Sequence, residues 1–407
     1  MSLIELTAEE FSEIIQVASE KSFLQSVEMA DLLKKRGSNT HFLAYRTNDQ
    51  YKVVALVFSK AMTGGLYMEL NSGPVCLDEA YLQDFYRALK DYAHAHGVLE
   101  LVVKPYQTYQ TFDKQGHPLN AENPKNIQLL TQLGFTHDGL QTGYPNGEPV
   151  WHFVKDLTNL DKTNLISSFN SNGKRLIKKG HSYPITVRPL KREELSIFKD
   201  IQDATSERRG YQNKKLDYYQ DFYDCFENKV EFLVATINFK EYSEQLTIEK
   251  GLVHKTICQL EKDLTSKKNQ TKISIEKNKL SKIEKLLEQL QNFLAQGYTG
   301  DTAIASNLII YTKQETCYLF GGFYPQFNQF NAPYLLQEYA MQQTIDKRIP
   351  LYNFLGITGD FDGSDGVLRF KQNFNGYIVR KMGTFRYYPR PLRYRIIQTI
   401  KKIIGRK

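Results

Sequence analysis

The stretch TAIASNLIIYTKQETCYLFGG, residues 302–322, contains two apolar runs joined by a short polar turn. Runs of this length that are rich in β-branched and aromatic residues predict strands. An earlier part of the chain has the same form, with YKVVALVFS at 51–59 followed by GLYMELNSG at 65–73. In both places the second run ends on glycine and a helical pattern follows. The two stretches therefore predict that one folding unit occurs twice in the chain.

The elements around these strands repeat in the same order. The predicted elements of the first half are helices at 7–19 and 27–36, strands at 41–47, 51–59 and 65–70, a helix at 79–96 and a strand at 98–103. Those of the second half are helices at 192–207 and 215–227, strands at 231–239, 302–312 and 315–322, a helix at 332–347 and a strand at 350–357. The sequence predicts two α/β units of mixed (α+β) type, with chance agreement among short elements as the alternative.

A heptad pattern interrupts the second unit at residues 241–298. Apolar residues occupy the a and d positions of two segments, which predicts an antiparallel helical hairpin that projects as an arm. These residues are Leu246, Val253, Ile257, Leu260 and Leu264 in the first segment, and Ile273, Leu280, Ile283, Leu287, Leu290 and Leu294 in the second. We expect a coiled coil of this kind to be structural or to contact a large partner.

These patterns divide the chain into two domains and an arm. The first domain is predicted at 1–150, and the second at 151–240 and 299–385. The tail, 386–407, packs back on the first domain or lies on a membrane. With 407 residues the chain is too long for one ordinary core. The four cysteines have no CxxC spacing and the N-terminus lacks the pattern of a secretory signal, so we expect a cytoplasmic protein without a metal.

The basic residues are concentrated in two segments that contain no acid. Residues 162–192 carry eight Lys or Arg and residues 366–407 carry twelve, while the rest of the chain has 33 basic and 45 acidic residues. Two positive surfaces on an otherwise acidic protein favour partners that bear phosphate, such as nucleic acid or an anionic membrane. The alternative is that both segments are solvated helix faces.

Common catalytic signatures, such as a Walker loop, GxGxxG, HExxH or GxSxG, are absent from the sequence. The stretch LRFKQNF (368–374) alternates in a way that predicts a strand, with Lys371 on the face opposite Phe370. If that face lines a cleft, the ammonium group would meet a phosphate or a developing oxyanion. A solvated surface lysine is the alternative.

Several segments together resemble the Fem family of peptidoglycan branch-forming aminoacyltransferases. They include FLQSVEMADLLKKRG (23–37), TSERRGYQNKKLDYYQDFY (205–223) and YNFLGITGDFDGSDGVLRFKQNFNGYIVRKMGTF (352–385). The resemblance implies two tandem GNAT-like (acyl-CoA N-acyltransferase-like) domains, the second interrupted by a helical hairpin. It also implies transfer of an amino acid from aminoacyl-tRNA to an amine of the lipid-linked muropeptide, lipid II, without a cofactor.

The resemblance assigns roles to individual residues. The lysine of the family's FK pair is Lys371, after Phe370, and its expected role is to bind the tRNA acceptor end or to stabilise the oxyanion. The family's DP aspartate falls on Lys104, which puts a carboxylate base at that point in doubt. We therefore expect the substrate or the departing tRNA ribose to handle the proton.

The expected substrate contacts come from both domains. The basic residue before the paired aromatics Tyr218 and Tyr219 is Lys214, where relatives often have arginine. The family's first-domain lysine aligns near Leu33, so a neighbouring lysine must take its role. The expected substrate-binding residues are Lys34, Lys35, Arg208, Arg209, Lys214, Tyr218 and Phe370, and those for tRNA are Lys174, Arg175, Lys178 and Lys179.

The tail places Leu392, Ile396, Ile400 and Ile403 on one helical stripe with cations elsewhere. It predicts an interfacial helix at the anionic inner membrane leaflet, and a helix docked on the first domain is the alternative. The resemblance implies alanyl-tRNA and lipid II as partners, with alanine as the second residue of the branch; the tail adds the membrane surface, and DNA is not expected. Two other functions stay open, an acyl-CoA-dependent N-acetyltransferase and a non-catalytic tRNA- or lipid-binding homologue.

Overall fold

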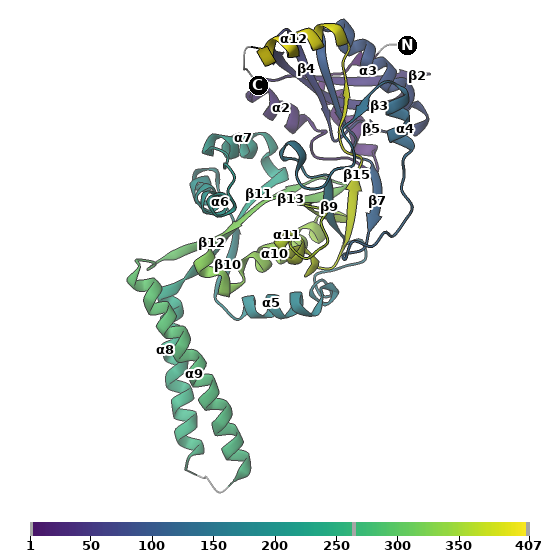
Figure 1. The fold of residues 1–407 in the computed structure, drawn as a ribbon. Coiled ribbons are helices and arrows are strands. Elements are labelled where there is room, and N and C mark those ends of the chain that lie inside the picture. Colours follow the sequence, from purple (N-terminus) through teal and green to yellow (C-terminus); the bar gives the residue numbers. More distant parts are fainter. Residues whose placement is uncertain (1–2, 263–265, 404–407) are drawn as a thin grey trace.

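The computed structural model describes residues 3–262 and 266–403 and contains two mixed sheets, each covered by helices (Figure 1). The first sheet has the order β1-β2-β3-β4-β6-β16-β8, with β5 also pairing β3. Its strands are β1 (Ile4–Glu5), β2 (Asn39–Thr47), β3 (Gln50–Met62), β4 (Gly65–Asn71), β5 (Val75–Cys76), β6 (Val98–Lys104), β8 (Thr136–His137) and β16 (Phe385–Tyr387). The helices beside it are α1 (Ala8–Ile14), α2 (Val27–Lys35), α3 (Leu82–Ala95), α4 (Lys125–Gln132) and α12 (Pro391–Ile403).

The second sheet has the order β10-β11-β12-β13-β14-β9-β15-β7. Its strands are β7 (Thr108–Phe112), β9 (Trp151–Asp156), β10 (Ile185–Pro189), β11 (Val230–Asn238), β12 (Asp301–Tyr311), β13 (Glu315–Phe323), β14 (Leu351–Ile357) and β15 (Tyr377–Lys381). The associated helices are α5 (Ser171–His181), α6 (Leu195–Arg209), α7 (Leu216–Phe226), α10 (Ala332–Asp346) and α11 (Gly366–Gln372).

The predicted repeat is confirmed at the level of topology. In the first sheet β2, β3 and β4 are antiparallel neighbours, and β4 then pairs in parallel with β6 after the crossover helix α3. In the second sheet β11, β12 and β13 form the same meander, and β13 pairs in parallel with β14 after α10. A parallel pair needs such a crossover, which is why each glycine-ended strand is followed by a helix.

The chain exchanges strands between the two sheets, so the predicted boundary at residue 150 does not describe the architecture. β7 lies inside the range 1–150 but pairs with β15 in the second sheet. In the opposite direction, β16 follows β15 and returns to the first sheet, where it lies between β6 and β8. These strands are short and their pairing is non-local, so no periodic pattern in the sequence indicated where they cross.

The two domains share one apolar cluster at their interface. Phe23 of the first domain and Phe226 of α7 lie with ring centroids 6.2 Å apart, and both side chains are buried. Lys35 at the end of α2 lies 3.7 Å from Asp221 of α7. Because apolar side chains from both domains bury one another, the two sheets are held in a fixed relative position.

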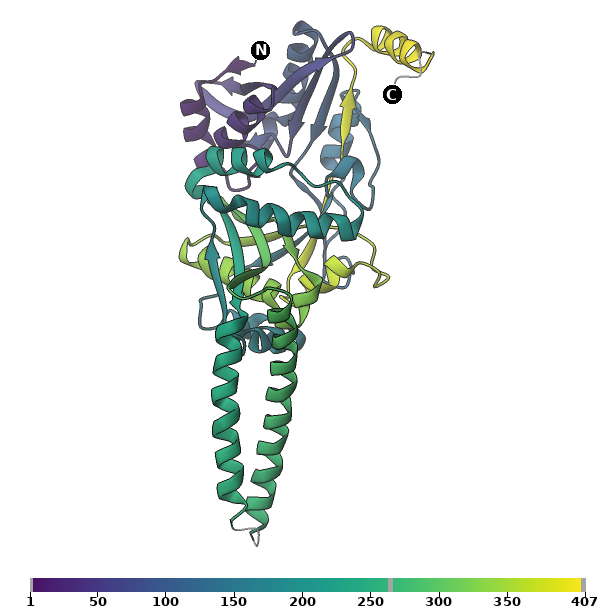
Figure 2. The same ribbon diagram turned by 90° about the vertical axis from the view of Figure 1, so that its left-hand side faces the viewer.

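The arm is an antiparallel pair of long helices, α8 (Phe239–Leu260) and α9 (Lys267–Ala295), that projects away from the second sheet (Figures 1 and 2). Most of the predicted seam is confirmed: Leu246, Val253, Ile257, Ile273, Ile283 and Leu290 are buried, whereas Leu260, Leu280, Leu287 and Leu294 are half-buried. Leu264 lies outside the described residues. Ion pairs such as Lys250–Glu284 at 2.9 Å join the two helices along their exposed sides.

The C-terminal helix α12 lies against the first domain near β6 (Figure 1). The side chain of Ile397 covers Gly64, where an added Cβ would come within 2.3 Å of it. The predicted stripe faces outward: Leu392, Ile396, Ile400 and Ile403 are 75%, 61%, 48% and 78% exposed. Residues 404–407 of the predicted tail lie outside the described residues. Within the described ranges, no helix combines the length and the apolar character that crossing a bilayer requires.

Candidate active site

The two parallel strands of the second sheet stop pairing part-way along their length. β13 and β14 are in register from Glu315–Leu351 to Cys317–Asn353, and no further pair follows. β14 then contains an irregularity between Asn353 and Gly356, where Leu355 takes a left-handed φ of 55°. We call the stretches that no longer pair with each other, residues 318–323 of β13 and 354–357 of β14, the fork; on their outer sides they still pair with β12 and β9. Inner-edge backbone groups at such a fork are not taken by the β13–β14 ladder and are free to bind a side chain or a ligand.

Lys371 lies on helix α11 and not on a strand, which corrects the sequence prediction. Asp365 caps this helix by accepting hydrogen bonds from the backbone N–H groups of Val367 at 2.7 Å and Leu368 at 3.1 Å. The same carboxylate accepts from the backbone of Thr358 at 3.0 Å. The sequence signal for this helix was the capping aspartate, which accepts hydrogen bonds from the free N–H groups of the first turn. This stabilisation of a helix matters more than the short alternation of LRFKQNF, which suggested a strand.

The Lys371 ammonium group is buried against the fork. The residue is 3% exposed, and its Nζ donates to the carbonyl oxygens of Leu355 at 3.1 Å and Gly356 at 2.5 Å. Burial lowers the pKa of Lys371 to about 7, with Asp365 opposing and Arg209 assisting this shift. A lysine in this position holds the irregular turn of β14 and places a titratable positive charge at the fork.

Arg209 acts on this group through its charge. It ends α6, and its charge lowers the pKa of Lys371 and opposes the burial that raises the pKa of Tyr318 to about 12. Arg208 is turned differently, with its guanidinium carbon 4.3 Å from the ring centroid of Phe323. The charge of Arg209 thus acts on Lys371 and Tyr318, while Arg208 lies over Phe323, the last residue of β13 and of the fork.

The predicted contacts on α2 and α7 form a second group, which we call the cation face. Tyr218 of α7 has Lys214 Nζ 5.6 Å from its ring centroid and the guanidinium carbon of Arg36 at 3.9 Å. Arg36 was missed by the sequence analysis, although it directly follows Lys35 at the helix end. The ring of Tyr218 also lies 6.4 Å from that of Phe320, which belongs to the fork. The cation face and the fork are therefore neighbours.

The two lysines predicted on α2 are engaged in ion pairs. Lys34 pairs with Asp31 on its own helix at 3.2 Å, and Lys35 lies between Asp221 and Asp224 of α7. Of the three consecutive basic residues, Arg36 is therefore the one that contacts Tyr218. Phe370 contacts neither group but packs against Tyr334 and Phe374 with centroids 5.0 and 5.3 Å apart.

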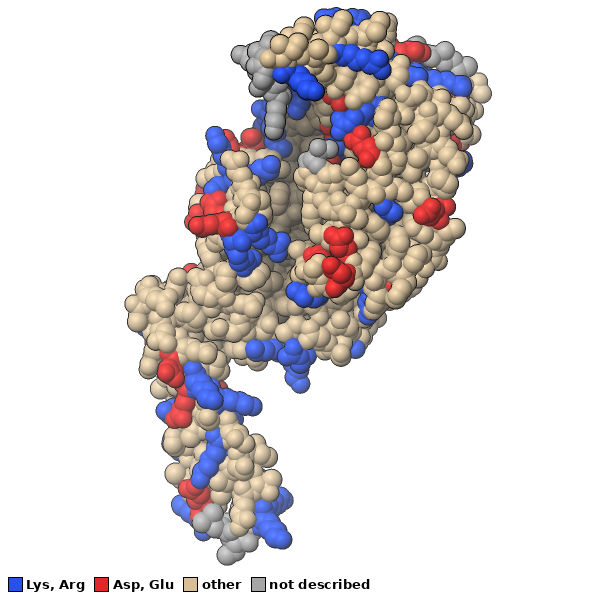
Figure 3. All heavy atoms as spheres, in the orientation of Figure 1, with Lys and Arg blue, Asp and Glu red and all other residues tan. Residues whose placement is uncertain are grey.

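Helix α5 presents its four predicted tRNA contacts to solvent. Lys174, Arg175, Lys178 and Lys179 are exposed, and among the described residues none of them forms an ion pair. The opposite side of α5 is anchored next to the end of α11, where Asn172 donates to Asn373 at 2.8 Å. Figure 3 shows basic side chains on the lower surface, where Figure 1 places α5.

A groove runs over this region on the face shown in Figure 3, between the part that carries α6 and α7 and the part that carries β9 and β15. Lys and Arg side chains lie on both of its sides (Figure 3). Such a groove suits substrates that carry several phosphates, because many weak attractions add along its length.

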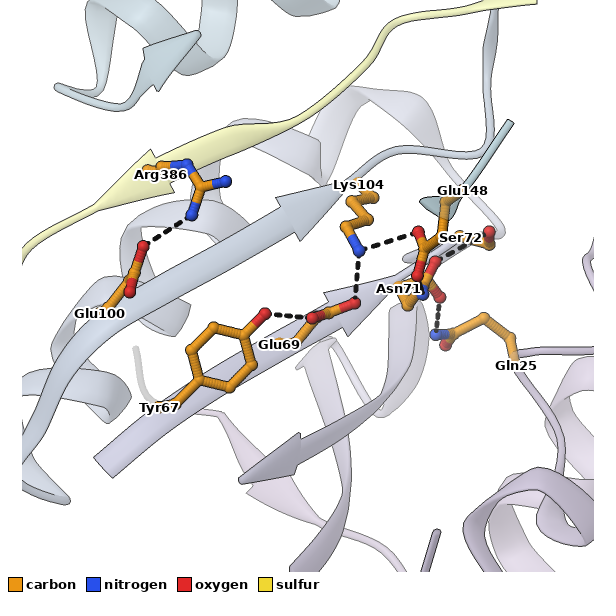
Figure 4. Close-up of polar contacts among 9 residues, drawn as sticks. All are labelled: Gln25, Tyr67, Glu69, Asn71, Ser72, Glu100, Lys104, Glu148 and Arg386. Carbon is orange, nitrogen blue, oxygen red and sulfur yellow. Dashed lines mark hydrogen bonds and ion pairs between the residues drawn. The ribbon is translucent and has the colours of Figure 1, made fainter. Parts of the chain in front are cut away.

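The corresponding place in the first domain holds a polar cluster, drawn in Figure 4. Lys104, at the end of β6, pairs with Glu69 and Glu148 at 2.8 Å each. Asn71 donates to Glu148 at 3.2 Å, and Gln25 donates to the backbone oxygen of Asn71 at 2.8 Å. Two carboxylates thus lie beside Lys104, and sequence spacing gave no sign of either.

Comparisons with known proteins agree with this architecture. The model of the FemAB family matches residues 6–402. Aminoacyltransferase FemB of Staphylococcus epidermidis is 30% identical over 433 aligned positions, covering 99% of both chains. The crystal structure of FemX superposes with a TM-score of 0.78 at 21% identity, over 98% of this chain and all of that one. A tandem GNAT protein of clavulanic acid biosynthesis superposes with a TM-score of 0.51 at 8% identity, over 96% and 99%.

Proposed function

The chain belongs to the FemAB family, and from that membership we propose that it transfers alanine from alanyl-tRNA to the branch on the lysine side chain of lipid II. It is an aminoacyltransferase of peptidoglycan interpeptide-bridge synthesis with two tandem GNAT-like domains. The choice of alanine, and of the second position of the branch, rests on a likeness to the streptococcal family member MurN, also called FibB. The observation that carries the proposed reaction is the fork with Lys371 bound to its two carbonyl oxygens.

The reaction is aminolysis of an activated ester. The acceptor nitrogen attacks the ester carbonyl carbon, a C–N bond forms, and the bond from that carbon to the ribose oxygen breaks. The amine loses a proton and the ribose oxygen gains one, so neither ATP nor a cofactor is consumed. The protein has to position both substrates and to stabilise the negative charge that develops on the carbonyl oxygen.

Lys371 is our candidate for the charge-stabilising group. Its ammonium group is fixed by two hydrogen bonds and shielded from water, and a fixed charge in such a place is worth more than one in solution. Its pKa of about 7 means that the charged form is still populated near neutral pH. Arg209 adds a second positive charge close by.

The two substrates are proposed to approach from different surfaces. The exposed cations of α5 are suited to tRNA phosphates, and their helix is attached to the end of α11, which carries Lys371. The cation face, with Arg36, Lys214 and Tyr218, is suited to the diphosphate of lipid II. An arginine in this set can bind phosphate through two hydrogen bonds, a geometry that a lysine alone cannot offer.

The exposed stripe of α12 supports a peripheral contact with the anionic inner leaflet, where lipid II lies. Such a contact corresponds to a cytoplasmic location. Four large apolar side chains face outward, and Arg393, Arg395, Lys401 and Lys402 flank them. Each cation near such a surface contributes about 1 kcal/mol. Replacing Leu392, Ile396, Ile400 and Ile403 with serine should abolish binding to liposomes that contain phosphatidylglycerol. Unchanged binding would remove this part of the proposal.

A transfer assay tests the proposed reaction. Radiolabelled alanyl-tRNA and seryl-tRNA are each mixed with the protein and with lipid II that either carries or lacks a first branch residue. We expect alanine on the branched lipid II without added coenzyme A. Dependence on an acyl-CoA would favour an ordinary N-acetyltransferase. Binding of tRNA without transfer from any charged tRNA would favour a non-catalytic homologue.

A further inference from the structure

A cavity of about 410 Å³ lies between the two domains, away from the groups described so far. The first domain lines it with residues around the short helix Ile15–Val17 and the start of α2. The second domain lines it with the end of α7 and the turn that joins β12 to β13. None of its lining residues belongs to the fork, the cation face or α5. Its volume is that of a site for a small organic molecule.

The charged side chains around this cavity are mostly basic. Four lysines and one carboxylate line it: Lys21, Lys229, Lys313, Lys347 and Glu28. Glu28 pairs with Lys229, so three lysines remain without a carboxylate among the lining residues. Lys313 donates to the side-chain oxygen of Gln16 at 3.0 Å, and Lys347 lies 4.9 Å above the ring of Tyr311. The cavity therefore attracts anions.

Lys21 is the unpaired member of this group. Within residues 3–262 and 266–403 it forms no ion pair and no hydrogen bond, although it is only partly exposed. The pKa of Lys21 is lowered to about 8, chiefly by desolvation; Glu28 opposes this shift, and Lys229 and Lys313 add to it. A half-buried ammonium group without a partner is costly in free energy, and an anion bound beside it would remove that cost.

The rest of the lining is amphipathic. Phe23, Phe226 and Ile349 contribute apolar surface. Gln314 donates through its nitrogen to the backbone oxygen of Ala18 at 2.8 Å, while its side-chain oxygen is buried without a hydrogen-bond donor. An occupant that fits this lining has an anionic end, a compact apolar or aromatic body and a hydroxyl or amine donor.

We propose that this cavity binds a small phosphorylated organic molecule of nucleotide size, with its phosphate between Lys21 of the first domain and Lys313 of the second. The lysines act as point charges around the phosphate oxygens, and Gln314 accepts a hydrogen bond from the body of the ligand. Because the two lysines come from different domains, the ligand also ties the domains together. This inference does not depend on the transfer reaction, so its failure and that of the proposed function are distinguishable.

Calorimetric titration of the full-length protein with adenosine 5′-diphosphate tests this site, with adenosine and inorganic pyrophosphate as partial ligands. We expect one molecule bound per chain, and about tenfold weaker binding in Lys21→Met and in Lys313→Met. Glu28→Gln should bind more tightly, because it removes the carboxylate that repels phosphate. Lys285→Met, on the exposed side of the arm, is the matched control and should bind as the wild type does.

Two further readouts distinguish specific binding in this cavity from nonspecific electrostatic attraction of the ligand to the basic protein surface. Binding at pH 8 should take up a proton, since Lys21 is partly neutral there and the phosphate favours its charged form. The ligand should also raise the melting temperature of the wild type and not that of Lys21→Met. Equal loss in Lys285→Met, no change in Lys21→Met and Lys313→Met, or displacement of the ligand by deacylated tRNA would each overturn the assignment.

Discussion

The parallel strand pairs of the two domains begin alike and end differently. β4 and β6 stay paired up to Asn71–Lys104, whereas β13 and β14 stop at Cys317–Asn353. A lysine lies near the end of each pair, but Lys104 neutralises two carboxylates while Lys371 donates to two backbone carbonyl oxygens. The parallel strand pair of the first domain thus ends in a closed ion-pair cluster, whereas that of the second domain ends in the open fork. We propose that a substrate binds only where the ladder is interrupted, at the fork.

The largest effect is expected from removing the charge at the fork. Lys371→Met keeps the bulk of the side chain but cannot donate to Leu355 and Gly356, so the rate of alanyl transfer should fall about 10²–10³-fold. Single-turnover transfer with saturating alanyl-tRNA and lipid II measures this. Binding of lipid II should stay within about twofold of wild type, because Lys371 is proposed to stabilise the transition state and not the bound substrate. An unimpaired rate would make Lys371 a structural lysine only.

The next effect concerns tRNA binding by the second domain. Replacing Lys174, Arg175, Lys178 and Lys179 with glutamine should weaken tRNA binding about tenfold or more at low salt and flatten its salt dependence. Filter binding over a range of salt concentrations measures both. The matched control replaces four exposed lysines of the arm, Lys262, Lys268, Lys272 and Lys285, and should leave the affinity unchanged. An equal loss in the arm variant would show that net charge, and not α5, sets the affinity.

Removing the lysine at the closed end should affect stability more than rate. Lys104→Met leaves the buried Glu69 without its cation, and we expect a loss of about 2–3 kcal/mol in the free energy of unfolding. Urea denaturation measures that loss. The transfer rate of the folded variant should stay within about threefold of wild type. A rate loss as large as that of Lys371→Met would show that the ends of both strand pairs take part in catalysis.

The two lysines should also differ in their dependence on pH. The pKa of Lys371 is about 7 in the folded protein against 10.5 ordinarily, so between these values the unfolded chain binds more protons and stability rises with pH. The pKa of Lys104 is raised by its carboxylates, so its contribution is complete below pH 10.5 and is lost only above that. Between pH 7 and 9, wild type should gain stability relative to Lys371→Met and not relative to Lys104→Met. Chemical denaturation at several pH values decides this.

Much of the fold was predictable from local patterns. Alternating and apolar runs predicted the strands of both meanders, and the heptads predicted the arm, because each pattern reports burial of one face. The prediction of a strand at 368–374 was wrong, because α11 occupies this stretch and seven residues show too little periodicity to identify a helix. Asp365 was also not recognised as the cap of this helix. The exchange of β7 and β16 could not be predicted, since pairing between distant short strands leaves no local signal.

The site was predictable only in part. Lys371, Lys214 and Tyr218 came from the family resemblance and lie at the fork or on the cation face, and Arg209, from the same source, acts on Lys371 through its charge. Lys34 and Lys35 were predicted on α2, but Arg36 is the residue that contacts the ring of Tyr218, because only the end of α2 reaches this ring. The left-handed turn at Leu355 and the carboxylates around Lys104 depend on tertiary contacts, so no spacing in the sequence indicated them.

The position of the donor ester decides between the two strand pairs. A crystal structure of the protein with a short RNA that ends in a non-hydrolysable alanyl amide would show which strand pair receives the donor. We predict that the alanyl carbonyl oxygen lies at the fork, within hydrogen-bonding distance of Lys371 or of the backbone of residues 354–357. A donor bound instead at the end of β4 and β6, beside Lys104 and Glu148, would place the reaction in the first domain and leave Lys371 without a catalytic role.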